Sequence, residues 1–206
     1  MNKIKLNKWG KIGILSGLVI GFIFAANSAM AADSAVWTTL DVSGKLTDKV
    51  TLGVSEELRF ADATGPSLAR QHTDIGATYN LGVVSAIGGY RNTSADEHRP
   101  YVGVGMRLLS GDLNLDSVTR LELRDWDTLR GRTELTASAS VAGVTPWVTD
   151  EVFVDESGLT GNRASIGVTK ALNDTWSLNA YYLLDSAIGD STSNTHVLGL
   201  GLSVGL

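Results

Sequence analysis

The chain lacks the residues that cross-link small secreted domains, and it has few of the charges that cover soluble ones. Its 206 residues include no cysteine and only 3 prolines, and 19% are charged, against about 25% in a typical soluble domain. The absence of cysteine excludes a disulfide framework, a thiolate metal site and a cysteine nucleophile. A formal net charge of -5 does not fit a nucleic-acid-binding protein, which presents a basic face. With a mean hydropathy near zero, what remains is one β-rich or membrane-linked domain.

The first 31 residues have the three-part layout of a secretory signal peptide. Residues 1–11 carry four lysines and no acid, and an apolar run follows from Ile12 to Ala26. This run is short for a membrane-spanning helix, which needs about 20 apolar residues, although an uncleaved membrane anchor is the alternative. Ala29-Met30-Ala31 fits an A-x-A cleavage site. We predict cleavage after Ala31, which divides the chain into a signal peptide, residues 1–31, and one exported domain, residues 32–206.

The exported domain is acidic and contains no second long apolar run. Removing four lysines from 17 basic residues leaves 13, against 22 acidic residues. Such a domain is either soluble outside the cytoplasm or crosses a membrane without a hydrophobic helix. The second case requires a closed β-barrel, because only helices and closed barrels satisfy every backbone hydrogen-bonding group in lipid.

Alternating hydrophobicity along the exported domain favours the barrel. At the C-terminus, Leu198, Leu200, Leu202, Val204 and Leu206 share one face of an extended segment, while glycine and serine dominate the other. Segments of about ten residues with this period of two are typical of transmembrane β-barrels. Eleven such segments occur, at residues 36–46, 50–60, 72–81, 83–91, 99–109, 113–125, 130–141, 144–154, 162–172, 176–185 and 196–206.

The connections predict short turns at one end of the barrel and longer polar loops at the other, as in outer-membrane barrels. The longer loops are expected at residues 61–71, 92–98, 155–161 and 186–195. Single-chain bacterial barrels have even strand numbers, so either the segment at 36–46 does not close the wall or a further strand is hidden. We predict an all-β, antiparallel, transmembrane up-and-down β-barrel of 10–12 strands, preceded by a cleavable signal peptide.

Charged residues indicate which face of each strand points inward. The exported domain has 10 arginines and 3 lysines, and most arginines alternate with apolar residues, as Arg120 and Arg124 do with Leu121 and Leu123. An arginine on the lipid side at the bilayer midplane costs about 2–4 kcal/mol, so these side chains belong in the lumen or at a membrane interface. We predict a lumen lined by Glu57, Arg59, Arg91, Arg99, Arg107, Arg120, Glu122, Arg124, Arg130, Arg132, Glu134, Glu151 and Arg163.

Two interpretations of this lumen remain open. The arginines could line a channel or binding barrel for small anionic solutes, because the planar guanidinium pairs with oxyanions bidentately. Alternatively, arginines and glutamates fill the lumen of a closed structural or surface-interaction barrel as one polar network. A barrel of 10–12 strands allows both, since it lies between packed eight-stranded barrels and water-filled porins.

An outer-rim lipid or peptide hydrolase is a third hypothesis. The three histidines, His72, His98 and His196, fall at the ends of the longer loops, on the predicted outer side. A carboxylate beside a histidine is what a proton-transfer dyad or a metal site needs. Solvated loops are rich in such residues in any case, and the sequence has no G-x-S-x-G or H-E-x-x-H motif. We predict no catalytic residue, no metal and no cofactor.

The outer face of the barrel is expected to carry aromatic girdles at the two membrane interfaces. Glu56 breaks the apolar face of the segment at 50–60 and is therefore expected near an interface. The aromatic residues near segment ends are Trp37, Trp126, Trp147, Trp176, Tyr90, Tyr181 and Tyr182.

A series of polar marks, taken in order, resembles one bacterial family. They are Glu57-Leu58-Arg59, Gly89-Tyr90-Arg91, Arg120-Leu121-Glu122-Leu123-Arg124, Arg130-Gly131-Arg132, Asp150-Glu151-Val152-Phe153 and Asn162-Arg163. Over nearly the whole exported domain the chain resembles the DUF2490 family of secreted, predicted outer-membrane barrel proteins. The R-x-E-x-R run followed closely by R-x-R is the most specific part. A more distant similarity is to the oligogalacturonate-specific porins, small arginine-lined barrels that pass acidic sugars.

The chain departs from the family pattern in two places. Many members carry a glutamate before the strand that starts here at Arg99, whereas here Pro100 follows Arg99 and Glu97 is displaced. Many outer-membrane barrels end in an aromatic residue, whereas this chain ends in Leu206. The resemblance supports the fold and the outer-membrane location, and the sequence as a whole predicts a monomeric outer-membrane β-barrel of a Gram-negative bacterium. Its expected partners are membrane lipid, the barrel assembly machinery and a small anionic solute, but not nucleic acid.

Overall fold

The computed structural model describes residues 34–61, 67–188 and 193–206, and these form eleven β-strands. Within the described residues, no helix is long and apolar enough to cross a membrane. The predicted signal peptide, residues 1–31, lies outside the described residues, so its cleavage stays a prediction. The strands are β1 (Ser34–Lys45), β2 (Val50–Ala61), β3 (Ser67–Asn80), β4 (Val84–Thr93), β5 (His98–Leu109), β6 (Leu113–Arg124), β7 (Thr128–Ala139), β8 (Thr145–Asp155), β9 (Gly158–Ala171), β10 (Trp176–Ala187) and β11 (Asn194–Gly205).

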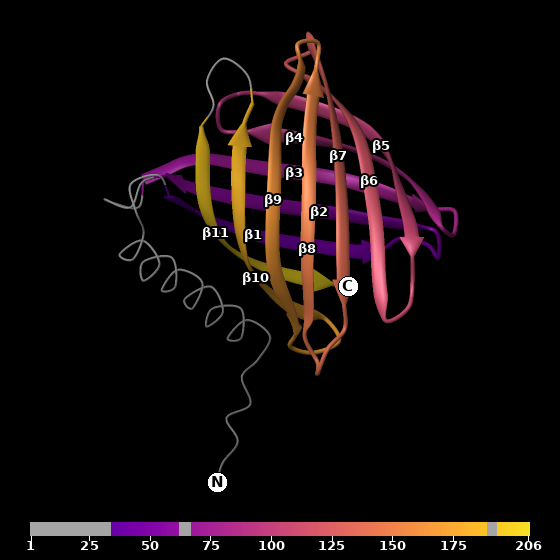
Figure 1. Ribbon diagram of the computed structural model, residues 1–206. Coiled ribbons are helices and arrows are strands. Elements are labelled where there is room, and N and C mark those ends of the chain that lie inside the picture. The colour runs from indigo at the N-terminus through magenta and orange to yellow at the C-terminus, as the bar shows by residue number, and fades with distance from the viewer. Residues whose placement is uncertain (1–33, 62–66, 189–192) are drawn as a thin grey trace.

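The strands follow one another around a closed barrel (Figure 1). Each pairs antiparallel with the next, and β1 closes the wall against β11. Eleven strands in up-and-down order leave the first and the last pointing the same way, so this closing pair is parallel, with Ser34–Ser43 beside His196–Gly205. The predicted all-β barrel of 10–12 strands is confirmed. Neither alternative given for the odd count was needed, because a parallel seam between the first and last strands closes a wall of eleven.

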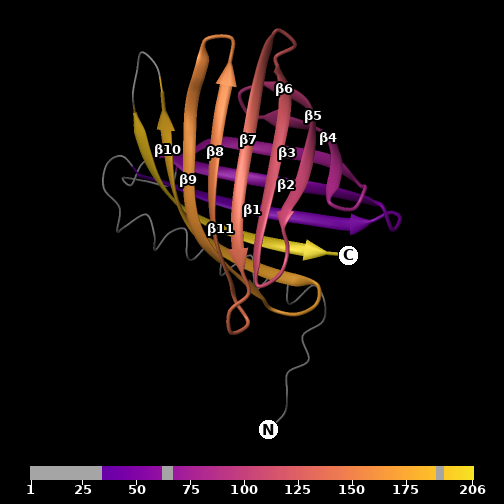
Figure 2. The ribbon, with the colours of Figure 1, turned by 45° about the vertical axis from the view of Figure 1, so that its right-hand side comes forward.

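The barrel strands are steeply tilted, so opposite walls cross one another. In Figure 2, β6–β9 lie roughly vertically across the front of the barrel, while β1–β3 cross behind them at a large angle. Such tilt and stagger are what allow a sheet to close on itself. Side chains from the two walls therefore approach each other across the lumen at different heights.

Strand alternation sends charged side chains inward and apolar side chains outward. Glu57 and Arg59 of β2 face a cavity that residues from eight strands line together, which identifies their face as the lumen. Leu52 and Val54 of the same strand are exposed on the other face. The outer surface is consequently apolar. Exposed leucine, valine or isoleucine side chains occur on every strand except β4 and β10, where Tyr90 and Tyr182 are the large exposed side chains.

The two ends of the barrel are named by residues that mark them. At the Leu206 end, β11 finishes beside the turn from β1 to β2; at the Glu97 end, β1 begins and β4 connects to β5. The predicted contrast between short turns and long loops is small, because residues 94–97, 125–127 and 156–157 are all that connect three of the strand pairs at the Glu97 end. The ladders of β3 and β9 extend into polar segments, since backbone pairing does not require apolar side chains.

Glu56 does not lie where its sequence context predicts. It occupies the middle of β2 on the outer face, where Oε2 accepts a hydrogen bond of 2.7 Å from the Thr73 hydroxyl. One carboxylate of this barrel is therefore held at mid-height on the apolar surface by a neighbour on β3, instead of lying near an end.

Candidate functional site

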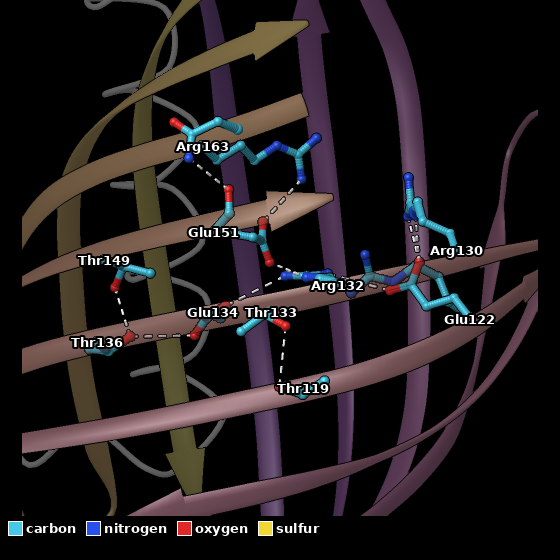
Figure 3. A network of polar contacts seen from close by, with 12 residues as sticks. Thr119, Glu122, Arg130, Arg132, Thr133, Glu134, Thr136, Thr149, Glu151 and Arg163 are labelled. Carbon is cyan, nitrogen blue, oxygen red and sulfur yellow. Dashed lines mark hydrogen bonds and ion pairs between the residues drawn. The ribbon is translucent and has the colours of Figure 1, made fainter. Parts of the chain in front are cut away.

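Arg132 of β7 is the centre of a polar network inside the barrel (Figure 3). Its Nε donates a short hydrogen bond to Glu151 of β8, and its guanidinium nitrogens lie 3.6 Å from Glu134 and 3.8 Å from Glu122. Glu122 of β6 faces Arg130 of β7 across the register and accepts hydrogen bonds from its Nε and Nη2, the latter at 2.5 Å. Glu122 is 2% exposed and Glu151 4% exposed. These carboxylates are thus removed from water and neutralised by arginine on the neighbouring strand.

The network continues around the barrel through Arg163 of β9. Its Nη1 lies 3.6 Å from Glu151 and its Nη2 lies 3.0 Å from Asp185 of β10. Arg163 therefore joins three strands that the sequence alone does not bring together. Asp185 was not among the predicted lumen residues, although Asp185 has the same strand parity as the inward-facing Leu183.

A second group of ion pairs lies on β2, β3 and β4. Arg59 pairs with Glu57 at 2.7 Å, and Nδ1 of the buried His72 lies 3.2 Å from the same carboxylate. On the adjacent strands, Arg91 pairs with Asp74 at 2.9 Å. This places the predicted residues Glu57, Arg59 and Arg91 on the lumen face and gives each arginine an acidic partner.

Glu97 holds two arginines at the end of the barrel that is named after it. It directly precedes β5, and its carboxylate accepts hydrogen bonds from Nη2 of Arg99 and, at 2.5 Å, from Nε of Arg124. Burial opposes ionisation of Glu97, but the hydrogen bonds from Arg99 and Arg124 outweigh it and lower the pKa of Glu97 to about 2. Glu97 is displaced from the position that the family pattern predicts, yet its carboxylate still pairs with Arg99 across the one intervening residue.

Arg107 lies apart from the network that its sequence pattern predicted it would join. It sits toward the Leu206 end of β5, pairs with Asp116 at 3.0 Å, and has a side chain that is 59% exposed. Arg107 shares the inward strand parity of Tyr101 but lies outside the network, whereas the other twelve predicted lumen residues lie on the inner face nearer to it. The lumen of the described barrel is therefore charged and cross-linked toward one end, whereas the paired Arg107 is left exposed toward the other.

Aromatic rings form part of the inner wall, which the sequence analysis did not predict. The Arg59 guanidinium lies 3.6 Å from the ring centre of Trp37, and that of Arg163 lies 4.8 Å from the ring centre of Phe153. Trp147 and Tyr181 also face the lumen. Arginine attracted to an aromatic face stays positioned without a further acid.

The assignment of Trp37, Trp147 and Tyr181 to outer girdles was wrong, because they share strand parity with inward charged residues. Tyr181 lies against Gly199 and Trp147 against Gly167, so closely that a Cβ on either glycine would overlap the ring. The strand glycines are thus the places where rings lie flat on the barrel wall. By contrast Tyr90 and Tyr182 are exposed on the outer face.

The histidines occupy two kinds of environment. His72 was expected at a loop end, but β3 begins at Ser67, so His72 lies within the strand and points inward. His98 and His196 do lie near the Glu97 end on the outside. Each hydrogen-bonds a tyrosine of the neighbouring strand, Tyr90 and Tyr182 respectively, instead of a carboxylate. In the described part of the chain, no three His, Asp or Glu side chains are grouped to hold a metal ion.

A cavity of about 260 Å³ lies inside the barrel beside the network. Its wall includes four arginines and four acids, so the formal charges balance. The charged residues are Asp41, Glu57, Arg59, Arg91, Arg132, Glu134, Glu151 and Arg163. Uncharged hydrogen-bonding side chains such as Asn179 and Thr149 complete the wall. The arrangement offers a small polar solute both donors and acceptors.

Comparison with known proteins gives one family match and several structural ones. The family model described as "Protein of unknown function (DUF2490)" matches residues 34–195. No curated protein sequence matches the chain. An anion-selective porin from Comamonas acidovorans has a TM-score of 0.38 at 14% identity; the alignment covers 75% of this chain and 57% of the porin, so the chain spans less than two thirds of its length.

The KdgM porin has a TM-score of 0.49 at 14% identity, with 78% of this chain and 87% of the porin covered. The KdgM porin in complex with disordered oligogalacturonate has the same TM-score and coverage at 15% identity.

Proposed function

The chain belongs to the DUF2490 family, whose function is unknown, and we propose that it is an outer-membrane β-barrel that passes small polar solutes through an ion-paired constriction. The observation that carries this proposal is the position of the Arg132–Glu151 network directly beside a lumen cavity with a charged wall. The network is built from ion pairs that can exchange partners.

The placement in a membrane is supported by the distribution of side chains over the two faces. Leu121, Leu135 and Ile166 are among many large apolar side chains exposed on the outside, while the charges face inward. In water such a surface would aggregate. In lipid it is favourable, and the closed barrel leaves no unpaired strand edge.

The constriction is supported by burial at the centre of the network. Glu122 and Glu151 are almost inaccessible inside the lumen, and we expect a solute moving along it to displace an arginine from one of them. Each arginine has alternative acids within reach, because Arg132 lies near Glu122, Glu134 and Glu151 at once. Partner exchange along this series would let a polar solute pass while charges stay compensated.

Conductance of the refolded barrel in a planar bilayer tests the proposal. The wild type is expected to conduct weakly. Glu151→Gln, which frees Arg132 and Arg163, should increase conductance and shift ion preference toward anions. Glu56→Gln is the matched control, because it removes an acid on the outer face of β2 and should leave conductance unchanged.

A closed structural barrel is the second candidate, favoured by the same burial of Glu122 and Glu151. If wild type and Glu151→Gln both fold and neither conducts, the closed barrel is correct and the channel is not. The third hypothesis, an outer-rim hydrolase, loses support from the partners of His98 and His196, since a proton-transfer dyad would need an acid where each has a tyrosine.

A further inference from the structure

Arg120 differs from the other predicted lumen arginines because it has no acidic partner. Eight of the nine lie within ion-pair distance of a carboxylate. Over the described ranges of the chain, Arg120 makes no such contact, and its buried Nε has no hydrogen-bond partner. The residue as a whole is nevertheless partly exposed on the inner face of the barrel.

The wall beneath Arg120 is shaped to hold its side chain. The stem lies over Gly103 of β5, where a Cβ would overlap the backbone carbonyl oxygen of Thr119 and approach Cγ of Arg120 to 2.8 Å. The guanidinium then lies 5.1 Å from the ring centre of Tyr101, whose hydroxyl is fixed by a hydrogen bond of 2.7 Å to Asp74. Arg120 is thus held against the wall by a glycine and an aromatic ring, without a counter-charge.

The electrostatic surroundings of Arg120 favour an anion. Arg132 lies directly opposite it in the register of β6 and β7, and like charges at opposed positions repel each other. The nearest acids along the two strands are already in use, since Glu122 pairs with Arg130 and Glu134 with Arg132. A positive charge that is partly desolvated and uncompensated is costly unless something neutralises it.

We propose that Arg120, with the Tyr101 ring beside it, is the binding site for a small oxyanion, a carboxylate or phosphate group, inside the lumen. The inference rests on the proposed function and specifies the solute class of that lumen. A guanidinium presents two parallel N–H donors, which match the two oxygens of a carboxylate or phosphate. The anion would take the place of the missing acid and relieve the repulsion between Arg120 and Arg132.

Chemical modification of arginine by phenylglyoxal, read by peptide mass spectrometry on the folded full-length barrel in detergent, tests the site. Arg120 should react faster than the paired Arg130 and Arg132. Inorganic phosphate, or sodium acetate in a parallel series, both at ionic strength held constant with sodium chloride, should slow the reaction of Arg120 about tenfold at ten times the dissociation constant. Arg70, exposed near the Glu97 end, is the internal control and should react at an unchanged rate.

The two series distinguish the oxyanions, since protection by phosphate alone or acetate alone names the group that fits. Gly103→Ala should displace the arginine stem and abolish the protection while Arg70 is unaffected. Equal protection of Arg70 and Arg120, or none at Arg120, overturns the proposal, and both are read on the wild type even if the variant does not fold. The modification rate does not depend on conductance, so the two proposals can fail separately. Protection of Arg120 without conductance supports the oxyanion site in a closed barrel. Conductance without protection supports the channel and rejects the oxyanion site.

Discussion

Glu122 of β6 and Arg130 of β7 face each other across one register position, and the carboxylate accepts two hydrogen bonds from the guanidinium. They are separated by the turn between the two strands, so the pair forms as soon as this hairpin is in register. Glu122 is 2% exposed, which makes it the most deeply buried carboxylate of the network. The hairpin of β6 and β7 thereby sets the arginine positions from which the rest of the network extends.

Removing the Glu122 carboxylate should strongly destabilise the barrel. Glu122→Ala leaves Arg130 and Arg132 without their shared acid, and breaking a buried pair costs about 3–5 kcal/mol. Glu134→Ala is the control: the Glu134 side chain is 32% exposed and 3.6 Å from Arg132, so its loss should cost under about 1 kcal/mol. Urea unfolding of the refolded barrel measures both. Similar small losses would mean that water fills the lumen around Glu122.

Arginine substitutions on the outer face of β7 should report the membrane depth of each position. Leu135 lies toward the middle of the strand and Leu129 near its start, and both are exposed on the same face. Leu135→Arg should cost about 2–4 kcal/mol and Leu129→Arg about 0–1, since the penalty falls toward the interface. The measurement is unfolding in lipid vesicles. Equal costs, or a larger cost for Leu129→Arg, would contradict the inside–outside assignment.

Deleting residues 197–206 should prevent the barrel from closing. The deletion removes most of β11 and leaves β1 and β10 each with one unpaired edge, which lipid does not tolerate. The expected result is loss of the heat-modifiable folded band on a gel. Deletion of Leu206 alone, which follows the last residue of β11, should keep that band. A folded protein lacking 197–206 would show that β11 is not the closing strand.

The Glu97 contact should make stability depend on pH in acid. Its pKa is lowered to about 2 from an ordinary 4.5 because the paired carboxylate, ionised, is held by Arg99 and Arg124. The stability it contributes is present above about pH 4.5 and is lost as the pH falls toward 2. The difference in unfolding free energy between wild type and Glu97→Gln should therefore shrink over that range. A difference that stays constant from pH 5 to 2 would exclude the Glu97 contact as its source.

The exported protein should begin at residue 32 and be recovered with outer membranes. The basic start, apolar run and A-x-A site at residues 29–31 support this expectation. Intact-mass spectrometry of the protein from fractionated cells gives both results. A retained N-terminus or a soluble periplasmic pool would contradict it.

Much of the fold could be predicted because side-chain alternation is a local property. Leu198, Leu200 and Leu202 are two residues apart, so any extended conformation places them on one face and the residues between them on the other. The same rule puts Arg120, Glu122 and Arg124 together on the inner face. The same rule turns Trp147 and Tyr181 inward, whereas their positions near segment ends had favoured the outer girdles.

The strand register and the ion pairs could not be predicted locally, because they depend on which strands become neighbours and at what offset. The parallel seam between β1 and β11 joins residues that lie at opposite ends of the chain, and no local pattern encodes that register. The contact of Arg163 with both Glu151 and Asp185 needs β8, β9 and β10 in register at once. Ion pairing is decided by distances of a few ångströms across strands, whereas alternation is decided within one strand. Alternation along the chain therefore predicts an arginine-lined barrel. The register of the strands pairs eight of the nine predicted lumen arginines with carboxylates and leaves Arg120 without one.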